Sequence, residues 1–138
     1  MFLQHPELMI ELLSPERGRG NDGVTDLPAL GMNAQPLRFM DVALMNTLKL
    51  YYEDIPVILP HPAAFALHKL LIAPRRQNPA KKQKDLDAAL AILDLIEKKG
   101  AYDDIRLLMT KFPEKWKTTI FATLHQFGRE ELAKQLTV

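Results

Sequence analysis

The stretch PAAFALHKLLIAPRRQNPAKKQKDLDAALAILDLIEKKG, residues 62–100, decides the fold of this chain. It predicts two helices joined by a short basic loop. Pro62 suits the first position of a helix, and Pro74 ends the first apolar stripe. From Lys81 to Lys99, Leu and Ala recur at the i, i+3 and i+4 spacing of an amphipathic helix, and Gly100 is a favourable residue just past a helix end.

The residues that follow this helical hairpin continue the helical pattern to the end of the sequence. Aromatic and aliphatic residues again recur at helical spacing, and prolines and glycines separate the segments. We therefore expect residues 61–138 to form one compact helical part. Beyond the hairpin it would contain three more helices, at about Tyr102–Lys111, from Pro113 to about Gln126, and at Glu130–Leu136.

The residues before the hairpin have a different pattern, because short apolar runs alternate with Pro, Gly, Asn and Asp. Such runs predict short strands, and residues 1–60 are expected to form a sheet lobe. The fold class is therefore α+β, with a small mixed or antiparallel sheet of three or four strands and about five helices. The expected segments are a buried strand at Leu8–Ser14, a long loop over 15–35, a strand at Pro36–Met40 or a helical turn at Asp41–Met45, and a hairpin made by Thr47–Tyr52 and Val57–Leu59.

Composition excludes several classes of function. Eighteen Lys and Arg balance seventeen Asp and Glu, and this balance argues against broad nucleic-acid binding. The absence of cysteine excludes disulfides and thiolate zinc sites within the sequence. No apolar run approaches the roughly 20 residues of a membrane span, and the first residues lack the pattern of a signal peptide. These features lead us to expect a cytoplasmic protein without a membrane partner.

The loop between the two predicted helices concentrates positive charge. Five basic residues fall within ten positions, at Arg75, Arg76, Lys81, Lys82 and Lys84. Such a loop is most simply a solvated helix–helix junction. Alternatively, arginines and lysines that converge near a helix N-terminus form a phosphate-binding site.

Lys69 and Asp85 flank this loop. Lys69 lies inside the apolar pattern of the first helix, where it could extend to solvent from the edge of the stripe. Alternatively, its ammonium group points into a cleft and meets a phosphate or a carboxylate. Asp85 lies about one turn into the second helix, so it can face back across the hairpin. There it could orient Lys69 or an arginine rather than take part in chemistry.

Glu11 is the acidic residue that stands out in the sheet lobe. It lies between Ile10 and Leu12, and alternation along a strand places it on the opposite face from both. It is either a solvated residue on a half-exposed strand or a carboxylate that helps to hold Mg²⁺. One carboxylate does not make a metal site, and no second acid follows on a strand nearby.

Three segments together resemble the nucleotidyltransferase-like proteins of bacteria that have the polymerase-β type fold. They are IELLSP (10–15), LPALGMNAQPLRFMD (27–41) and VILPHPAAFALHKLLIAPRRQNPAKKQKDLDAALAIL (57–93). The resemblance implies enzymes that transfer a nucleoside monophosphate from a nucleoside triphosphate to an acceptor with Mg²⁺. It implies that Glu11 is the third carboxylate of the metal site. It also implies that the nucleotide-facing wall contains Lys69, Arg75, Arg76, Lys84 and Asp85.

The sequence departs from that family pattern before Glu11. The Gly-Ser turn and the two paired acids that should precede this residue are missing from MFLQHPELMI (1–10). We therefore expect a chain that corresponds to the C-terminal, truncated portion of such an enzyme and is inactive alone. A small sheet with an exposed edge also leads us to expect a homodimer or a protein partner that covers it. Two alternatives remain open: a non-catalytic helical interaction module, and a remnant that binds nucleotide without turning it over.

Overall fold

The computed structural model describes residues 2–5, 7–16 and 23–137. Contacts divide the chain after Asp41 into two compact units, Met1–Asp41 and Val42–Val138, and each is described by itself. The first unit is built from short strands, and the second contains one hairpin and the helices. The α+β class predicted from the sequence is confirmed.

The first unit contains two small sheets. In one, β1 (Phe2–His5) pairs antiparallel with β2 (Leu8–Glu11). In the other, β5 (Met32–Leu37) is central, with β3 (Leu13–Pro15) parallel to it and β4 (Thr25–Leu27) antiparallel. The Arg38 guanidinium donates to both carboxylate oxygens of Glu16, at 2.6 and 2.7 Å, and thereby ties the end of β5 to the end of β3.

Two predictions for the first unit are wrong in detail. The expected single buried strand at Leu8–Ser14 is two strands in different sheets, and Ile10 and Leu13 are 45% and 44% exposed. Strands of three and four residues form sheets too small to bury both faces, so an apolar run here does not mean a buried strand.

The expected long loop over 15–35 also contains structure in its described residues. Pro28–Leu30 forms one 3-10 turn, η1, between β4 and β5. Gly31 follows it with φ +60°, a left-handed conformation that favours glycine. Residues 17–22 of the expected loop lie outside the described residues.

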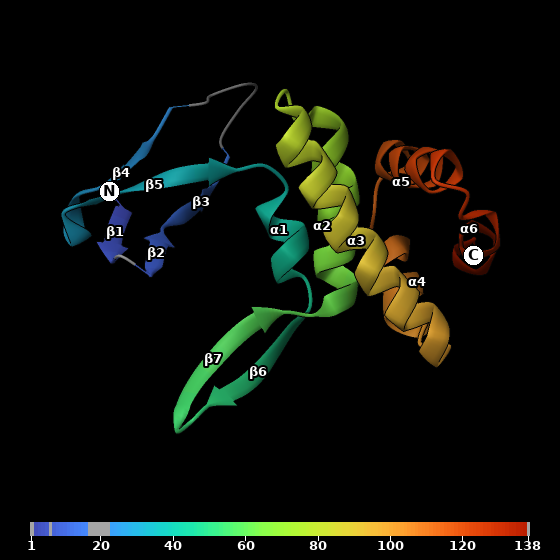
Figure 1. Cartoon of the computed structure of the whole chain (residues 1–138), viewed down its shortest axis with the longest axis horizontal. Coiled ribbons are helices and arrows are strands. Elements are labelled where there is room, and N and C mark those ends of the chain that lie inside the picture. The colour runs from blue at the N-terminus through green and yellow to red at the C-terminus, as the bar shows by residue number, and fades with distance from the viewer. Residues whose placement is uncertain (1, 6, 17–22, 138) are drawn as a thin grey trace. The chain divides into compact units, whose positions relative to one another are not determined.

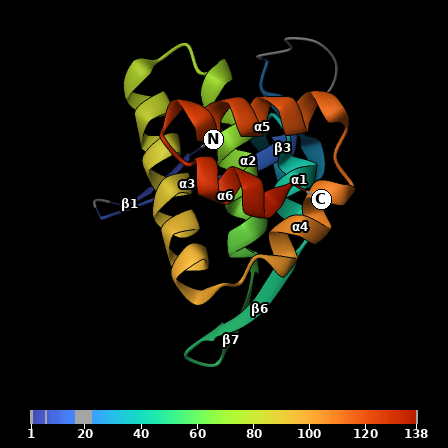
Figure 2. The same ribbon diagram turned by 90° about the vertical axis from the view of Figure 1, so that its right-hand side faces the viewer.

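The second unit begins with a short helix and the predicted hairpin. Helix α1 (Met40–Leu44) begins within one residue of the helical turn expected there. Strands β6 (Thr47–Tyr52) and β7 (Ile55–Pro60) then pair antiparallel, from Thr47 opposite Pro60 to Tyr52 opposite Ile55. Figures 1 and 2 both show this two-stranded ribbon extending away from the helices of its unit.

Helix α2 (Pro62–Ile72) is the centre of the helical part. Eight of its eleven residues are buried, so it is apolar almost all round, as expected of a helix enclosed by others. It packs against α3 (Pro79–Lys99), α4 (Asp103–Thr110) and α5 (Glu114–Gln126). Helix α6 (Glu130–Leu136) packs against α4 and α5, as Figure 2 shows.

The predicted helices are confirmed within a few residues of their expected ends. Pro62 is the first residue of α2, and a 3-10 turn at Ala73–Arg75, η2, contains Pro74. Gly100 ends α3 with φ +61°. Among the described residues, no helix has the length and apolar content required to cross a membrane.

Candidate functional site

The two helices of the hairpin are fixed at their ends by capping side chains. The His61 Nδ1 atom accepts a hydrogen bond from the Ala63 amide at 3.2 Å at the start of α2. The Asn78 side-chain oxygen accepts from the Lys81 amide at 3.1 Å at the start of α3, and Pro79 occupies the first helical position. These caps set where each helix begins and therefore which residues face each other across the hairpin.

Asp85 joins the two helices through two ion pairs. The Lys69 ammonium donates to Asp85 Oδ1 at 2.5 Å, and the Arg76 Nε–H donates to Asp85 Oδ2 at 2.8 Å. The Asp85 side chain is only 6% exposed, whereas those of Lys69 and Arg76 are 20% and 32% exposed. We call Lys69, Arg76 and Asp85 the α2–α3 ion cluster. The carboxylate lies inside, and the cations reach from it toward solvent.

The pKa of Asp85 follows from these contacts. Burial disfavours the charged carboxylate and by itself would raise the pKa. The hydrogen bonds and charges of Lys69 and Arg76 outweigh this effect and hold the Asp85 pKa below its ordinary value of 3.8. Asp85 is therefore ionised at neutral pH. Each of its oxygens accepts from a cation, so the Asp85 carboxylate holds both cations in place.

The ion cluster retains capacity to bind an anion. Lys69 uses one of its three N–H donors for Asp85, and Arg76 uses Nε–H, which leaves the paired Nη donors of its guanidinium. Two cations and one carboxylate give the cluster a net charge of +1. The Lys69 ammonium also lies 5.3 Å from the centre of the Phe65 ring, which helps to hold it in place.

The other predicted site residues of the hairpin lie at the margin of the ion cluster. Arg75 donates to the Leu71 carbonyl at 3.0 Å, so it caps the end of α2. Lys84 is exposed beside Asp85 on α3. Lys81 was not among the predicted site residues, although it precedes Asp85 by four positions and so shares its side of the helix. Helical spacing would have identified Lys81, whereas the Phe65 contact could not be read from a pattern.

Glu11 lies in the other unit, as the last residue of β2, and is exposed. Over the described ranges, no group of three or more His, Asp or Glu side chains gathers in a way that could hold a metal ion. Near Glu11 in sequence, Glu16 is already bound by Arg38. Among the described residues, Glu11 is therefore not part of such a group.

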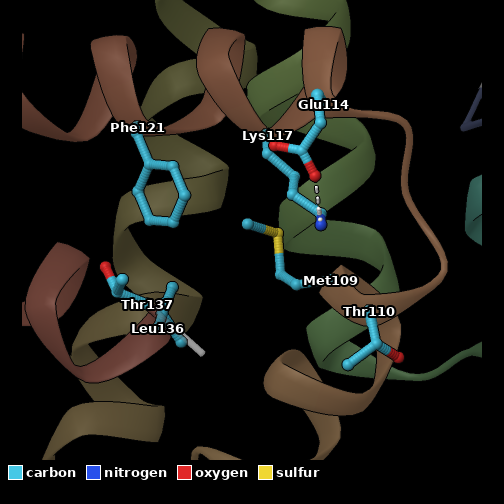
Figure 3. Close-up of a pocket in the computed structure, with 7 residues that line it drawn as sticks. All are labelled: Met109, Thr110, Glu114, Lys117, Phe121, Leu136 and Thr137. Carbon is cyan, nitrogen blue, oxygen red and sulfur yellow. Dashed lines mark hydrogen bonds and ion pairs between the residues drawn. The ribbon is translucent and has the colours of Figure 1, made fainter.

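In the described helical part, two cavities that are large enough to consider lie away from the ion cluster. One of about 360 Å³, shown in Figure 3, is lined by residues of α4, α5 and α6 with Met109 and Phe121 side chains facing it. Its polar groups are already paired: Lys117 binds Glu114 at 2.7 Å, and the Thr110 and Thr137 hydroxyls donate to backbone carbonyls. This cavity therefore offers few unpaired polar groups to a ligand.

The second cavity, of about 430 Å³, lies beside the start of α2 and the second half of α3, and most of its lining is apolar. His61 lies at its wall, and its Nε2 atom is 3.5 Å from the Asp104 carboxylate. The His61 Nδ1 atom is engaged as the cap of α2, so the imidazole has a structural role there. Neither cavity contains the ion cluster.

Comparisons with known proteins identify one family. The family model described as Nucleotidyltransferase matches residues 1–111, which include the strands, the hairpin of helices and α4. No curated protein and no solved structure matches this chain at a significant level. The matched range includes every residue of the ion cluster.

Proposed function

The chain belongs to the nucleotidyltransferase family, and on that premise we propose that its α2–α3 ion cluster binds the phosphates of a nucleoside triphosphate. In this proposal Lys69 and Arg76 contact the phosphate oxygens. Asp85 holds both cations in place, and Arg75 and Lys84 add positive charge at the margin. Nucleotidyltransferases transfer a nucleoside monophosphate from the triphosphate to an acceptor.

The observation that carries the proposal is the unequal burial within the ion cluster. Asp85 is enclosed, while the two cations that it fixes remain partly exposed and keep unused donors. A buried ion pair by itself contributes little to stability, because desolvation offsets the attraction between its charges. Two cations oriented on one carboxylate are instead well arranged for an anion, since their donors are held in position before it binds.

The start of α3 strengthens the positive field around the ion cluster. The first turns of this 21-residue helix carry Lys81, Lys82 and Lys84, and its N-terminus has the positive end of the helix dipole. A triphosphate bears several negative charges, so these lysines would attract it even where they do not touch it. Binding should therefore weaken as salt is added, because exposed charges are screened.

The test uses the full chain and measures ATP affinity by calorimetry, with and without Mg²⁺. Arg76→Lys keeps a cation for Asp85 but removes the two Nη donors. We expect it to weaken ATP binding about tenfold, the usual worth of a hydrogen bond to a charged group. Tripolyphosphate should compete with ATP, since the site recognises phosphate. Undiminished affinity in Arg76→Lys would overturn the proposal.

Lys84 and Lys98 provide a matched control on one helix. Both are exposed lysines of α3, separated by 14 positions, or roughly 21 Å along the axis. Lys84→Gln is expected to lower ATP affinity about two- to threefold through lost field strength. Lys98→Gln makes the same change of charge at the far end and should leave affinity unchanged. If both variants lowered ATP affinity equally, the overall charge of the helix would attract the triphosphate, and the ion cluster would not be a specific site.

We also propose that this chain does not transfer nucleotide by itself. Transfer needs carboxylates that hold metal ions against the reacting phosphate, and the described residues form no group of three or more acids or histidines around Glu11. Incubation of the pure chain with labelled triphosphates, Mg²⁺ or Mn²⁺ and cell lysate should give no labelled product. Label transfer that Glu11→Gln abolishes would contradict this part of the proposal and leave the phosphate site intact.

A further inference from the structure

The β6–β7 hairpin has one face that is apolar at every position. The register places Leu48 opposite Leu59, Leu50 opposite Val57, and Tyr52 opposite Ile55. Alternation along each strand puts these six side chains on the same side of the ribbon. The opposite face is mixed and carries Lys49 and Thr47 together with Tyr51, Pro56, Ile58 and Pro60. We call the first set the apolar face of the hairpin.

Four side chains of this apolar face are exposed, and Leu48 and Val57 are half-buried. Tyr52 is 72% exposed, Ile55 61%, Leu50 49% and Leu59 43%. A two-stranded ribbon is marginally stable alone and gains stability when one face is covered. Contiguous apolar patches of this kind on a protein surface mark sites of association.

The edges of the hairpin are poorly suited to further strand pairing. The His61 amide donates to the Asn46 carbonyl at 2.8 Å, so the hydrogen-bonded positions alternate from there along the ribbon. Pro56 and Pro60 then fall where a backbone N–H would face outward from β7, and proline supplies none. On β6, the backbone of Lys49 faces outward, and a lysine on an edge strand disfavours pairing with another strand. Association is therefore favoured at the face.

The exposed area suits a second copy of the same chain. The six side chains of the apolar face expose on the order of 500 Å² of surface, if their exposed fractions are applied to ordinary side-chain areas. Two copies would therefore bury roughly 1,000 Å² in total. This area is at the lower limit for a specific interface. The face carries no formal charge, so a two-fold pairing brings no like charges together.

We propose that two copies of this chain associate face to face through the apolar faces of their β6–β7 hairpins. In this two-fold arrangement, Tyr52 and Ile55 of one copy contact the apolar face of the other copy. Because a two-fold arrangement uses the apolar face of both copies, the association closes at two copies instead of growing into an extended sheet. The dimer does not require nucleotide, so it can be tested independently of the phosphate site.

The experiment compares two lysine substitutions of matched chemistry on opposite faces. Ile55 and Ile58 are 61% and 70% exposed, and only Ile55 belongs to the apolar face. Sedimentation equilibrium of the full chain from about 1 to about 100 µM should show a monomer–dimer equilibrium. Ile55→Lys should weaken the dimer at least about tenfold, because the interface would bury an unpaired ammonium group. Ile58→Lys should leave the dissociation constant unchanged.

Three results would overturn the proposal. One is a monomer over the whole concentration range. Another is a dimer that Ile55→Lys leaves intact or that both substitutions weaken equally. The third is a monomer in which Ile55→Lys alone lowers the melting temperature, because the apolar face would then be covered within one chain.

Discussion

At the scale of single residues, Asp85 controls how the helical hairpin responds to pH. Its pKa is lowered in the folded chain, so the stability that its ionised form provides is present above the ordinary value of 3.8. That stability is lost as the pH falls through the lowered folded pKa. Asp85→Asn should cost about 2–4 kcal/mol at neutral pH, because two cations lose their partner. The cost should shrink as the pH falls below 3.8 and through the lowered folded pKa. Urea unfolding at neutral pH and at acidic pH below 3.8 measures this.

Asp87 provides the control for that substitution, since it lies on the same helix two positions later. It is exposed and accepts from Gln83 at 2.7 Å, and no cation among the described residues is paired with it. Asp87→Asn should change the free energy of unfolding by less than about 0.5 kcal/mol at either pH. A similar loss in both variants would mean that Asp85 acts through general helix charge and not through the ion cluster.

Sequence spacing predicted that Asp85 could meet Lys69 or an arginine, and the structure shows that it meets Lys69 and Arg76. The pattern could not decide between one partner and two. The reason is that Arg76 follows a 3-10 turn, and the direction of its side chain depends on how that turn ends. Arg75, its neighbour, donates to the carbonyl of Leu71 instead. The sequence alone does not show which of these two adjacent arginines contacts Asp85.

At the scale of elements, the cap of α3 connects helix stability to the phosphate site. Asn78→Ala removes the acceptor for the Lys81 amide and should cost about 1 kcal/mol of stability. The first turn that bears Lys81 and Lys82 should fray, and ATP affinity should fall with it. Thermal unfolding and calorimetry measure the two effects. Asn78→Asp keeps the acceptor and should restore stability; failure to do so would contradict the capping role.

Helices α2 to α5 were predictable because each repeats one simple spacing over two or more turns and is followed within three residues by a proline or glycine. The strands of the first unit were less predictable, because three or four residues are too few to establish an alternation. Two residues with a left-handed backbone conformation were also not predictable from the sequence. Phe39 and Glu53, with φ of 58° and 53°, lie next to α1 and in the β6–β7 turn, where glycine or asparagine is the usual residue.

At the scale of the whole molecule, the second unit carries two separate surfaces. The ion cluster lies at the end of α2 that leads into α3, and the β6–β7 hairpin joins the other end, roughly 16 Å away along the helix axis. Phosphate binding and dimerisation should therefore be independent. Ile55→Lys should bind ATP with unchanged affinity while it weakens the dimer. Calorimetry below and above the dimer dissociation constant tests this, and a dependence of affinity on protein concentration would contradict it.

The most direct test of the central claim is the ATP affinity of Arg76→Lys, measured together with its melting temperature. The phosphate site predicts about a tenfold weaker affinity, with a melting temperature close to that of the unmodified chain because Asp85 keeps a cationic partner. Unchanged affinity would show that the ion cluster only holds the two helices together. A large fall in melting temperature with unchanged affinity would lead to the same conclusion.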